Sequence, residues 1–288
     1  MVYIIAEAGV NHNGKLDLAL QLVNIAKESG ADAIKFQTFK AIKLASKEAD
    51  KAKYQKESTD SNESQVDMLK KLELSYDEFR QIKKYCIKKG IEFISTPFDL
   101  ESAFFLNELN VNIYKIGSGD LTNYPLLRKV AQTGKKMILS TGMSNMDEVE
   151  NSVKYVLNNG CKELVVLHCI SNYPTKNEDL NLNAIKTMKE KLASIKSDIE
   201  IGFSDHTEGI DASVYSVCTG ATFIEKHFTI DKNMNGPDHR SSLNPDELNL
   251  FVKKIREIEV ILGNGIKKFR HSESENRKIV RRSLAYNI

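Results

Sequence analysis

The chain alternates between short apolar segments rich in isoleucine and valine and longer segments in which apolar residues recur at helical spacing. The apolar segments that we interpret as strands are 2–10, 33–39, 92–98, 113–119, 136–143, 163–170, 200–207 and 222–229. They are nearly continuous apolar runs, not strict alternations of apolar and polar residues. Such runs predict parallel strands that are buried on both faces.

Helical patterns fill the intervals between these strands. They cover 16–28, 76–89, 101–109, 124–132, 146–158, 182–195, 211–217 and 245–262. Several are followed by glycine, the residue that best tolerates the left-handed conformation at a helix end. Eight strand–helix units in 288 residues predict a (β/α)8 TIM barrel. A doubly wound open sheet is the alternative, but at this length it would normally use fewer strands.

Two segments depart from this repeat. Residues 40–74 form a long polar connection, and loops of this length are usually functional or solvated. On the catalytic face of a barrel the connection would be a lid or a substrate-contacting excursion; a solvated surface insertion is the alternative. Residues 266–288 are basic and polar. We therefore predict a barrel over 1–265 and a C-terminal tail or linker over 266–288.

Composition narrows the class of protein. The net charge of +2 indicates neither a nucleic-acid partner nor a membrane surface. Cys86, Cys161, Cys169 and Cys218 show no CxxC spacing, so we expect small core residues in a reducing compartment. No apolar run approaches the roughly 20 residues that span a bilayer, and the N-terminus is typical of a strand and not of a signal peptide. We expect a cytoplasmic protein.

Polar side chains collect at the carboxyl ends of the predicted strands, where barrel enzymes place their active sites. In chain order they are Glu7, Asn11, His12, Lys35, Gln37, Ser95, Thr96, Lys115, Ser118, Ser140, Thr141, His168, Ser171, Asn172, Tyr173, Ser204, His206, Glu225 and His227. Period-two alternation places Lys35 with Gln37, Ser204 with His206, and Glu225 with His227.

Lys35 and Lys115 lie within otherwise apolar strands, and lysine is rarely buried without a partner. A salt bridge to Glu7 or Glu225 would satisfy them. The alternative is an anionic ligand, because the serine and threonine hydroxyls at neighbouring strand ends are suited to phosphate and carboxylate oxygens. These residues together favour a compact phosphorylated acid.

His206 and His227 follow two adjacent strands, with Asp205 and Glu225 beside them. Two imidazoles plus oxygen donors are unlike a closed structural zinc site and are better suited to Mn, Mg or another labile divalent ion.

The remaining polar candidates have structural interpretations. We expect His12 to support the first loop, His168 to be a satisfied core residue, and His239 and His271 to be exposed. Asp238 follows a Gly-Pro turn after the last strand; it either supports that turn or accepts hydrogen bonds from sugar hydroxyls.

These motifs, in this order, resemble one enzyme family. The matching segments are IIAEAGVNHNG, AIKFQTF, FISTPFD, YKIGSGDLTNYPLL, ILSTGM, LHCISNYPT, GFSDHT, IEKHFT and GPDH, from Ile4 to about Ser283. They are similar to the sialic acid (N-acetylneuraminate) synthases and to the related legionaminate and pseudaminate synthases. The resemblance implies a cytoplasmic, homodimeric transferase of carbohydrate biosynthesis with a divalent metal cofactor, Mn or Mg. Its reaction would condense phosphoenolpyruvate with an N-acyl hexosamine to a nine-carbon keto acid and phosphate, with C–O cleavage.

The resemblance also implies roles for individual residues. The positions that would hold phosphoenolpyruvate are Lys35, Thr96, Lys115, Ser118, Ser140, Ser171 and Ser204, with Asn172 as the alternative to Ser171. Sugar contacts would come from Glu7, Gln37, Tyr173 and Asp238, and the metal ligands would be His206 and His227. Lys35 and Lys115 would stabilise the charges of the reaction, and Glu7 or Asp120 would orient the attacking water. Asp120 stands where relatives often have glutamate.

Members of this family usually continue, after a junction such as Arg281-Arg282-Ser283, into a small antifreeze-like domain that supplies an arginine to the neighbouring subunit. The sequence given ends at Ile288, before such a domain. We expect the barrel to fold and to bind phosphoenolpyruvate and metal without it.

Other activities remain possible at this stage. A different metal-dependent aldolase or 3-deoxy-sugar-acid synthase would need a Schiff-base lysine or phosphate-binding arginines, and Arg80, Arg128 and Arg256 fall on predicted helices. Arg240, in a loop, could approach the site. This favours an unphosphorylated sugar. A non-catalytic ligand-binding barrel is the third hypothesis.

For a synthase of this family, the acceptor would be N-acetylmannosamine or a 6-deoxy diacetamido analogue. The residues at 54–55 and 63–65 favour the sialate/legionaminate branch of the family over the pseudaminate branch.

Overall fold

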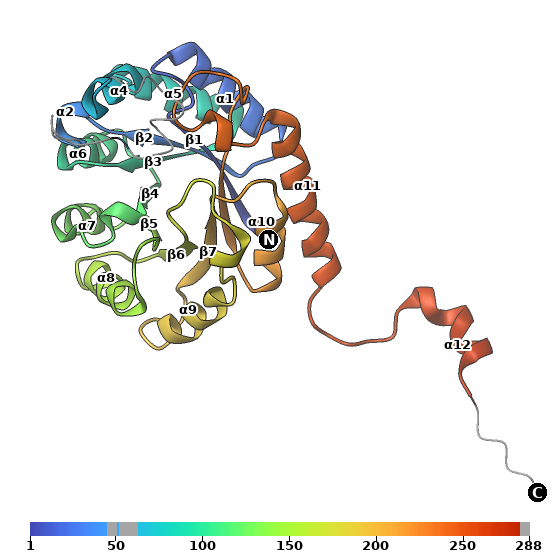
Figure 1. The fold of residues 1–288 in the computed structure, drawn as a ribbon. Coiled ribbons are helices and arrows are strands. Elements are labelled where there is room, and N and C mark those ends of the chain that lie inside the picture. Colours follow the sequence, from blue (N-terminus) through green and yellow to red (C-terminus); the bar gives the residue numbers. More distant parts are fainter. Residues whose placement is uncertain (45–50, 52–62, 283–288) are drawn as a thin grey trace, which may run out of the picture.

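The computed structural model describes residues 1–44, 51 and 63–282. Eight parallel strands form a closed barrel in chain order, with the last strand paired to the first (Figure 1). The strands are β1 (Tyr3–Gly9), β2 (Ala33–Thr38), β3 (Glu92–Pro97), β4 (Ile113–Ile116), β5 (Lys136–Ser140), β6 (Leu164–Cys169), β7 (Glu200–Asp205) and β8 (Phe223–His227). This confirms the predicted (β/α)8 TIM barrel and excludes the open sheet.

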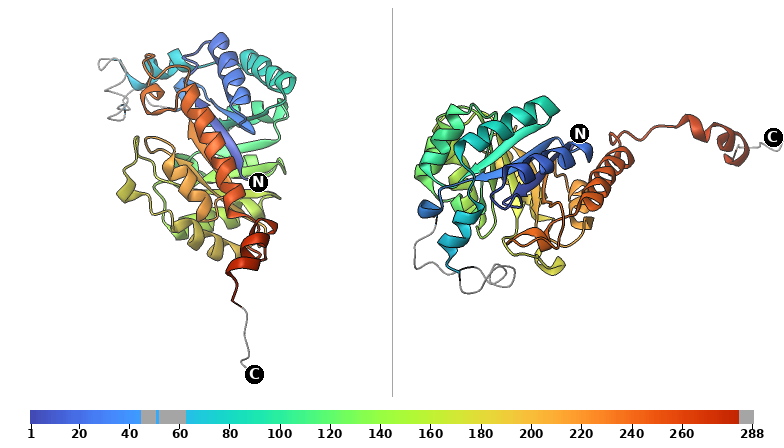
Figure 2. Two further views of the ribbon diagram at one scale, coloured as in Figure 1. Left: turned by 90° about the vertical axis from the view of Figure 1, so that its right-hand side faces the viewer. Right: turned by 90° about the horizontal axis from the view of Figure 1, so that it is seen from above.

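One helix follows each strand and covers the outside of the barrel (Figures 1 and 2). These helices are α1 (Leu16–Glu28), α5 (Tyr76–Lys89), α6 (Leu100–Glu108), α7 (Tyr124–Ala131), α8 (Met146–Asn158), α9 (Ala184–Ala193), α10 (Asp211–Cys218) and α11 (Pro245–Leu262). Each lies within two residues of its predicted ends. The first turns of α5, α8 and α11 are fixed by capping boxes, in which a Ser or Asn side chain and a Glu three residues later satisfy each other's backbone amides.

Two predicted strands end earlier than expected. The strand expected over 113–119 stops at Ile116, and the strand expected over 136–143 stops at Ser140. A 3-10 turn over Ser118–Asp120 follows the first of them. Ser118 therefore extends from a turn at the barrel rim and not from a strand.

Two apolar layers support the barrel. The larger layer lies between the strands and the surrounding helices. The smaller layer fills the barrel interior with Ile5, Ala33, Ile94, Ile113, Ile138, Val165, Leu167 and Phe223. Because these residues occupy the amino-terminal half of the lumen, the polar inward-facing residues are confined to the carboxyl ends of the strands.

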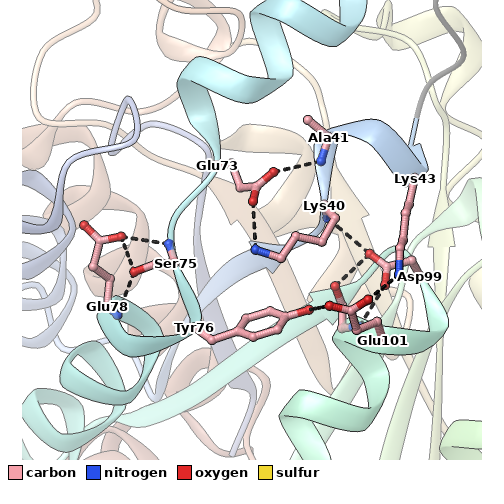
Figure 3. Close-up of polar contacts among 10 residues, drawn as sticks. Lys40, Ala41, Lys43, Glu73, Ser75, Tyr76, Glu78, Asp99 and Glu101 are labelled. Atoms are coloured by element: carbon pink, nitrogen blue, oxygen red, sulfur yellow. Dashed lines mark hydrogen bonds and ion pairs between the residues drawn. The ribbon is translucent and has the colours of Figure 1, made fainter.

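The described ends of the 40–74 connection lie at this carboxyl rim. They contain α2 (Ala41–Leu44) and α4 (Gln65–Leu72), which pack together with Val10 and Phe39. Figure 3 shows the polar contacts that fix them: the Glu73 carboxylate accepts a hydrogen bond from Lys40 Nζ at 2.8 Å and from the Ala41 amide at 2.9 Å. The connection thus belongs to the face on which it was expected, although residues 54–55 lie outside the described residues.

The C-terminal segment leaves the barrel after α11. It contains α12 (Ser274–Val280), which extends away from the barrel in Figure 1 and in the right-hand view of Figure 2. Within the part of the chain that the structure describes, no helix is both long and apolar enough to cross a membrane.

The cysteine prediction is correct for three residues and wrong for one. Cys86, Cys161 and Cys169 are buried, whereas Cys218 is exposed because it is the last residue of α10 and faces away from the core.

A buried ion pair joins β7 to β8 on their outer face. Asp205 and Lys226 are register partners, and their carboxylate and ammonium groups are 2.9 Å apart with almost no exposure. Asp205 also accepts hydrogen bonds from the amide and hydroxyl of Thr207, and Lys226 donates to the Thr207 carbonyl. Side chains alternate between the two faces of a strand. Because Asp205 and Lys226 point outward, the preceding residues Ser204 and Glu225 point into the lumen.

We expect Asp205→Ala to lower the free energy of unfolding by about 3–5 kcal/mol, because Lys226 would keep a buried charge without its partner. Urea denaturation monitored by circular dichroism measures the change. The matched control is Glu150→Ala, which removes the exposed pair with Lys154 on α8 and should cost less than about 1 kcal/mol. Equal losses in the two variants would contradict the structural role of the buried pair.

Candidate active site

A cavity of about 250 Å³ opens at the carboxyl ends of the strands, and all eight strands contribute to its wall. It brings together twelve of the predicted site residues: Glu7, Lys35, Gln37, Thr96, Lys115, Ser118, Ser140, Ser171, Tyr173, Ser204, His206 and His227. They come from positions spread over most of the sequence, so the closed barrel is what makes them neighbours.

The charged centre of this cavity is Glu225. Its carboxylate lies 3.6 Å from the ammonium of Lys35 and 3.5 Å from that of Lys115, and it accepts a hydrogen bond from Ser204 Oγ at 2.9 Å. Lys35 is also 2.9 Å from Glu7. All of these charged residues are at most 4% exposed. The sequence left two explanations for the buried lysines, salt bridges or an anionic ligand. The salt bridges to Glu7 and Glu225 are present.

The two carboxylates differ in their electrostatics. Burial acts to raise the pKa of Glu225, but Lys115, Lys35 and the Ser204 hydroxyl outweigh it and hold this pKa at about 2. Burial raises the pKa of Glu7, and Lys35 opposes this only in part. Glu225 is thus a permanent counter-ion, whereas Glu7 is the carboxylate better able to exchange a proton.

Several polar atoms in the cavity have spare hydrogen-bonding capacity. Glu7 Oε2 and Ser140 Oγ are buried and make no hydrogen bond within the described structure. A buried polar group without a partner calls for a specific explanation. Near them, Lys35 Nζ donates to Thr96 Oγ1 at 3.3 Å, and burial lowers the pKa of Lys115, an effect that Glu225 offsets in part. This part of the wall offers cations and hydroxyls to a ligand rich in oxygen.

The two predicted metal ligands face each other at one side of the cavity. The rings of His206 and His227 are 5.7 Å apart, and Tyr173 packs against His206 at 4.0 Å. His206 Nδ1 lies 2.8 Å from the carbonyl oxygen of Ile170. Because a carbonyl can only accept, Nδ1 carries the hydrogen and Nε2 keeps its lone pair for a ligand.

His227 also has a ring nitrogen that makes no hydrogen bond. Its Nδ1 is buried without a hydrogen-bond partner, and burial together with His206 and Lys35 places its pKa well below the usual value. Burial alone would lower the pKa of His206, but its contacts with Cys169 and the Ile170 carbonyl raise it. In its deprotonated form each of the two imidazoles has a ring nitrogen whose lone pair fits a divalent cation. Among the described residues, no group of three or more His, Cys, Asp or Glu side chains is arranged to hold a metal, so the pair fits an open site completed by water and substrate.

Asp238 lies on the far side of the histidines. It lines a small recess with Tyr173, His206, His227 and Ser241, and burial raises its pKa to about 6. This position suits a carboxyl group that contacts a ligand lying over the imidazoles.

Besides Asp238, two predicted site residues are not part of the cavity wall. Asp120 accepts a hydrogen bond from Asn123 at 2.9 Å beside the start of α7, and Asn172 is exposed, with its carbonyl bound by the Thr175 hydroxyl. Neither lines the cavity as described. Each follows a strand end by several residues, where strand alternation no longer decides the direction of a side chain.

The predictions for the other histidines are mostly confirmed. His12 accepts a hydrogen bond from the Gly14 amide, His168 is bonded to the Leu180 carbonyl, and His271 is exposed. The prediction that His239 is exposed is wrong. It is fully buried between Thr229 and Asn13, because the loop after β8 folds back over the first loop of the chain.

Asn11 and Asp205 also have structural contacts. Asn11 Nδ2 donates to the Phe228 carbonyl at 2.8 Å and to Ser242 Oγ at 2.9 Å, which ties the loop after β1 to the loop after β8. The carboxylate of Asp205 is paired with Lys226 and accepts hydrogen bonds from Thr207 and Ser213. It is therefore not a third ligand beside His206 and His227.

Sequence reasoning did not select some of the residues that line the cavity. They are Cys169, Phe98 and Met143. Strand alternation could have indicated Cys169, two residues before Ser171. No comparable signal marks Phe98 and Met143, which lie beyond the strand ends.

Comparison with known proteins gives a consistent picture. The model of the NeuB family matches residues 22–267. The chain is 48% identical to N,N'-diacetyllegionaminic acid synthase of Campylobacter jejuni over 283 residues, which cover 98% of this chain and 83% of that protein. It is 39% identical to human N-acetylneuraminate-9-phosphate synthase, covering 92% of this chain and 72% of that protein.

A solved structure is similar over almost the same range. It is the sialic acid synthetase of Leptospira borgpetersenii in complex with citrate, with 37% identity and a TM-score of 0.85, covering 98% of this chain and 93% of that chain.

We expect Glu225→Gln to increase the stabilisation of the protein by inorganic phosphate. Lys35 and Lys115 would lose their shared counter-ion, so an added anion would no longer compete with a carboxylate for them. Thermal unfolding at increasing phosphate concentration measures this as a larger rise in melting temperature than in the wild type. The control is Glu200→Gln, whose pair with Lys136 lies at the opposite end of the barrel. If Glu225→Gln and Glu200→Gln respond alike, the two buried lysines are not the anion site.

Proposed function

The chain belongs to the NeuB family, and from this premise we propose that it is a nonulosonic acid synthase, a transferase that condenses phosphoenolpyruvate with an N-acyl hexosamine. The products are a nine-carbon 2-keto sugar acid and inorganic phosphate. The observation that carries the proposal is one cavity in which Lys35 and Lys115, a set of hydroxyls and two imidazoles converge. The similarity to synthases of this type supports it.

Phosphoenolpyruvate is assigned to the side of the cavity formed by β2 to β7. Lys35 and Lys115 supply positive charge, and hydroxyl donors come from Thr96, Ser118, Ser140, Ser171 and Ser204. A phosphate and a carboxylate present several acceptor oxygens, which suits a wall of donors with unused capacity. In so buried a cavity each of these interactions is stronger than in water.

The acceptor sugar is assigned to the opposite side, between Gln37, Tyr173, Asp238 and the histidines. Gln37 Nε2 donates to Glu7 Oε1 at 3.3 Å, which leaves the amide oxygen of Gln37 as an acceptor for a sugar hydroxyl. A divalent ion, Mn or Mg, held by His206 and His227 would act as a Lewis acid on the aldehyde oxygen of the open-chain sugar.

The reaction follows from this arrangement. The enol carbon of phosphoenolpyruvate attacks the aldehyde carbon of the sugar. One C–C bond forms, the π bond of the aldehyde breaks and its oxygen takes up a proton, and positive charge develops on the carbon that bears the phosphate oxygen. Water adds to that carbon and loses one proton to a carboxylate, which balances the proton taken up by the aldehyde oxygen. The C–O bond to phosphate then breaks as the remaining hydroxyl proton leaves, which gives the ketone and inorganic phosphate. Glu7 is the better base, because its free oxygen lies in the cavity and Asp120 lies outside the wall. Lys35 and Lys115 hold the phosphate while its charge increases.

The acceptor we favour is a 6-deoxy diacetamido sugar, with N-acetylmannosamine as the alternative. The support is the higher identity to the legionaminic acid synthase of C. jejuni than to the human N-acetylneuraminate-9-phosphate synthase. The protein acts in the cytoplasm as a homodimer in this proposal, as the resemblance to the family implies.

Incubation with phosphoenolpyruvate, Mn and each N-acyl hexosamine should release inorganic phosphate in proportion to keto acid formed. We expect faster release with the diacetamido sugar than with N-acetylmannosamine, measured by phosphate colorimetry and mass spectrometry of the product. Controls omit the sugar or the metal. If no sugar of this class releases phosphate while phosphoenolpyruvate still binds, the protein is a ligand-binding barrel and not a synthase.

His206→Ala should abolish metal-dependent turnover and weaken Mn binding without unfolding the barrel, because the side chain lies at the rim and not in the apolar core. Isothermal titration with Mn provides a readout that does not depend on activity. His271→Ala, which changes an exposed histidine outside the barrel, is the control and should behave as the wild type. Unchanged Mn affinity in His206→Ala would refute the metal assignment.

A further inference from the structure

The backbone at Gly142 passes unusually close to two serines of the cavity wall. Gly142 lies in the turn after β5, and its amide donates a hydrogen bond to Ser118 Oγ at 3.0 Å. A side-chain carbon placed on Gly142 would lie 2.2 Å from Ser171 Oγ and 2.8 Å from Ser118 Oγ. Both distances are far shorter than a van der Waals contact, so the missing side chain is what leaves room for the two hydroxyls.

Backbone conformation does not explain this glycine. Gly142 is absent from the residues with positive φ, so other amino acids could adopt its backbone angles. The requirement is one of space. The two nearest atoms are side-chain hydroxyl oxygens, Ser118 Cβ follows at 3.2 Å, and no backbone atom is among the three nearest. This distinguishes Gly142 from Gly202, where an added carbon would meet the Phe223 carbonyl oxygen at 2.3 Å.

The groups around this point share a chemical character. Ser118, Ser140 and Ser171 come from three successive strand ends and line the same cavity as Lys115. Ser140 Oγ is buried there and has no hydrogen-bond partner within the described structure. Hydroxyls gathered beside a buried ammonium are suited to the oxygens of an anion.

We propose that Gly142 is a positioning residue for phosphoenolpyruvate: its lack of a side chain allows the Ser118 and Ser171 hydroxyls to meet at the anion. This rests on the proposed function. It assigns no contact with the ligand to Gly142 itself, which acts through the two serines.

From the positions of the two serines we expect Gly142→Ala to change ligand binding more than the stability of the fold. In Gly142→Ala each serine can turn to another staggered rotamer, so the strain is relieved at little cost to the fold. Turning removes the Ser118 oxygen from the Gly142 amide and moves both hydroxyls from their present positions. The protein should therefore remain folded and lose affinity for the anion.

The experiment compares Gly142→Ala with Ser194→Ala, which changes an exposed side chain just after α9 and outside the cavity. Calorimetric titration with phosphoenolpyruvate, and separately with inorganic phosphate, measures affinity. We expect Gly142→Ala to weaken phosphoenolpyruvate binding by roughly tenfold or more, the effect of losing one or two hydrogen bonds to a charged group. Ser194→Ala should remain within about twofold of the wild type, since the substitution lies on the surface outside the cavity. The melting temperatures of both variants should stay close to that of the wild type.

A double-mutant cycle tests the route of the effect. In a Ser118→Ala/Ser171→Ala background, adding Gly142→Ala should cause little further loss, because the hydroxyls that it displaces are already absent. A full additional loss in that background would overturn the proposal. So would wild-type affinity in Gly142→Ala, or its failure to fold, since the only atoms closer than 3.0 Å to the added carbon are rotatable hydroxyl oxygens. If the wild type binds no phosphoenolpyruvate, the proposed function fails, and the titrations with inorganic phosphate still decide the role of Gly142.

Discussion

The site depends on one carboxylate, that of Glu225, which two lysines share in the lumen of the barrel. Lys35 and Lys115 enter from strands on different sides of the lumen, and each would be costly to bury alone. A single glutamate on β8 satisfies both at about 3.5 Å. With its pKa near 2 it stays ionised, which favours the charged form of both lysines. Glu7 is thereby left with a free oxygen and a raised pKa, and the two carboxylates acquire different roles.

The division of the lumen into two zones makes this arrangement possible. Branched and aromatic side chains fill its amino-terminal half, and polar residues follow toward the rim. The apolar floor holds the strands in register and keeps water from the lysines from below. On the outside, the pair of Asp205 with Lys226 fixes the same two strands from which Glu225 and the histidines extend. The site is therefore held from both faces of the sheet.

The sequence predicted the barrel and most of the site because both follow from short-range periodicity. Apolar runs gave the parallel strands, and alternation correctly placed Lys35 with Gln37 and Glu225 with His227 on the inner face. It could not choose between a salt bridge and a ligand for the lysines, since that depends on distances across the lumen. The predicted positions of side chains were also less accurate beyond the ends of the strands. Asp120 lies outside the wall and His239 is buried, because loop contacts such as that between His239 and Asn13 have no local pattern.

The pairing of the first strand with the last has a consequence for biosynthesis. During translation β1 and β2 leave the ribosome long before β8, so β1 has an unpaired apolar edge until His227 has been made. Lys35 has no Glu225 partner before that point. The nascent chain therefore assembles its charged centre only as the barrel closes.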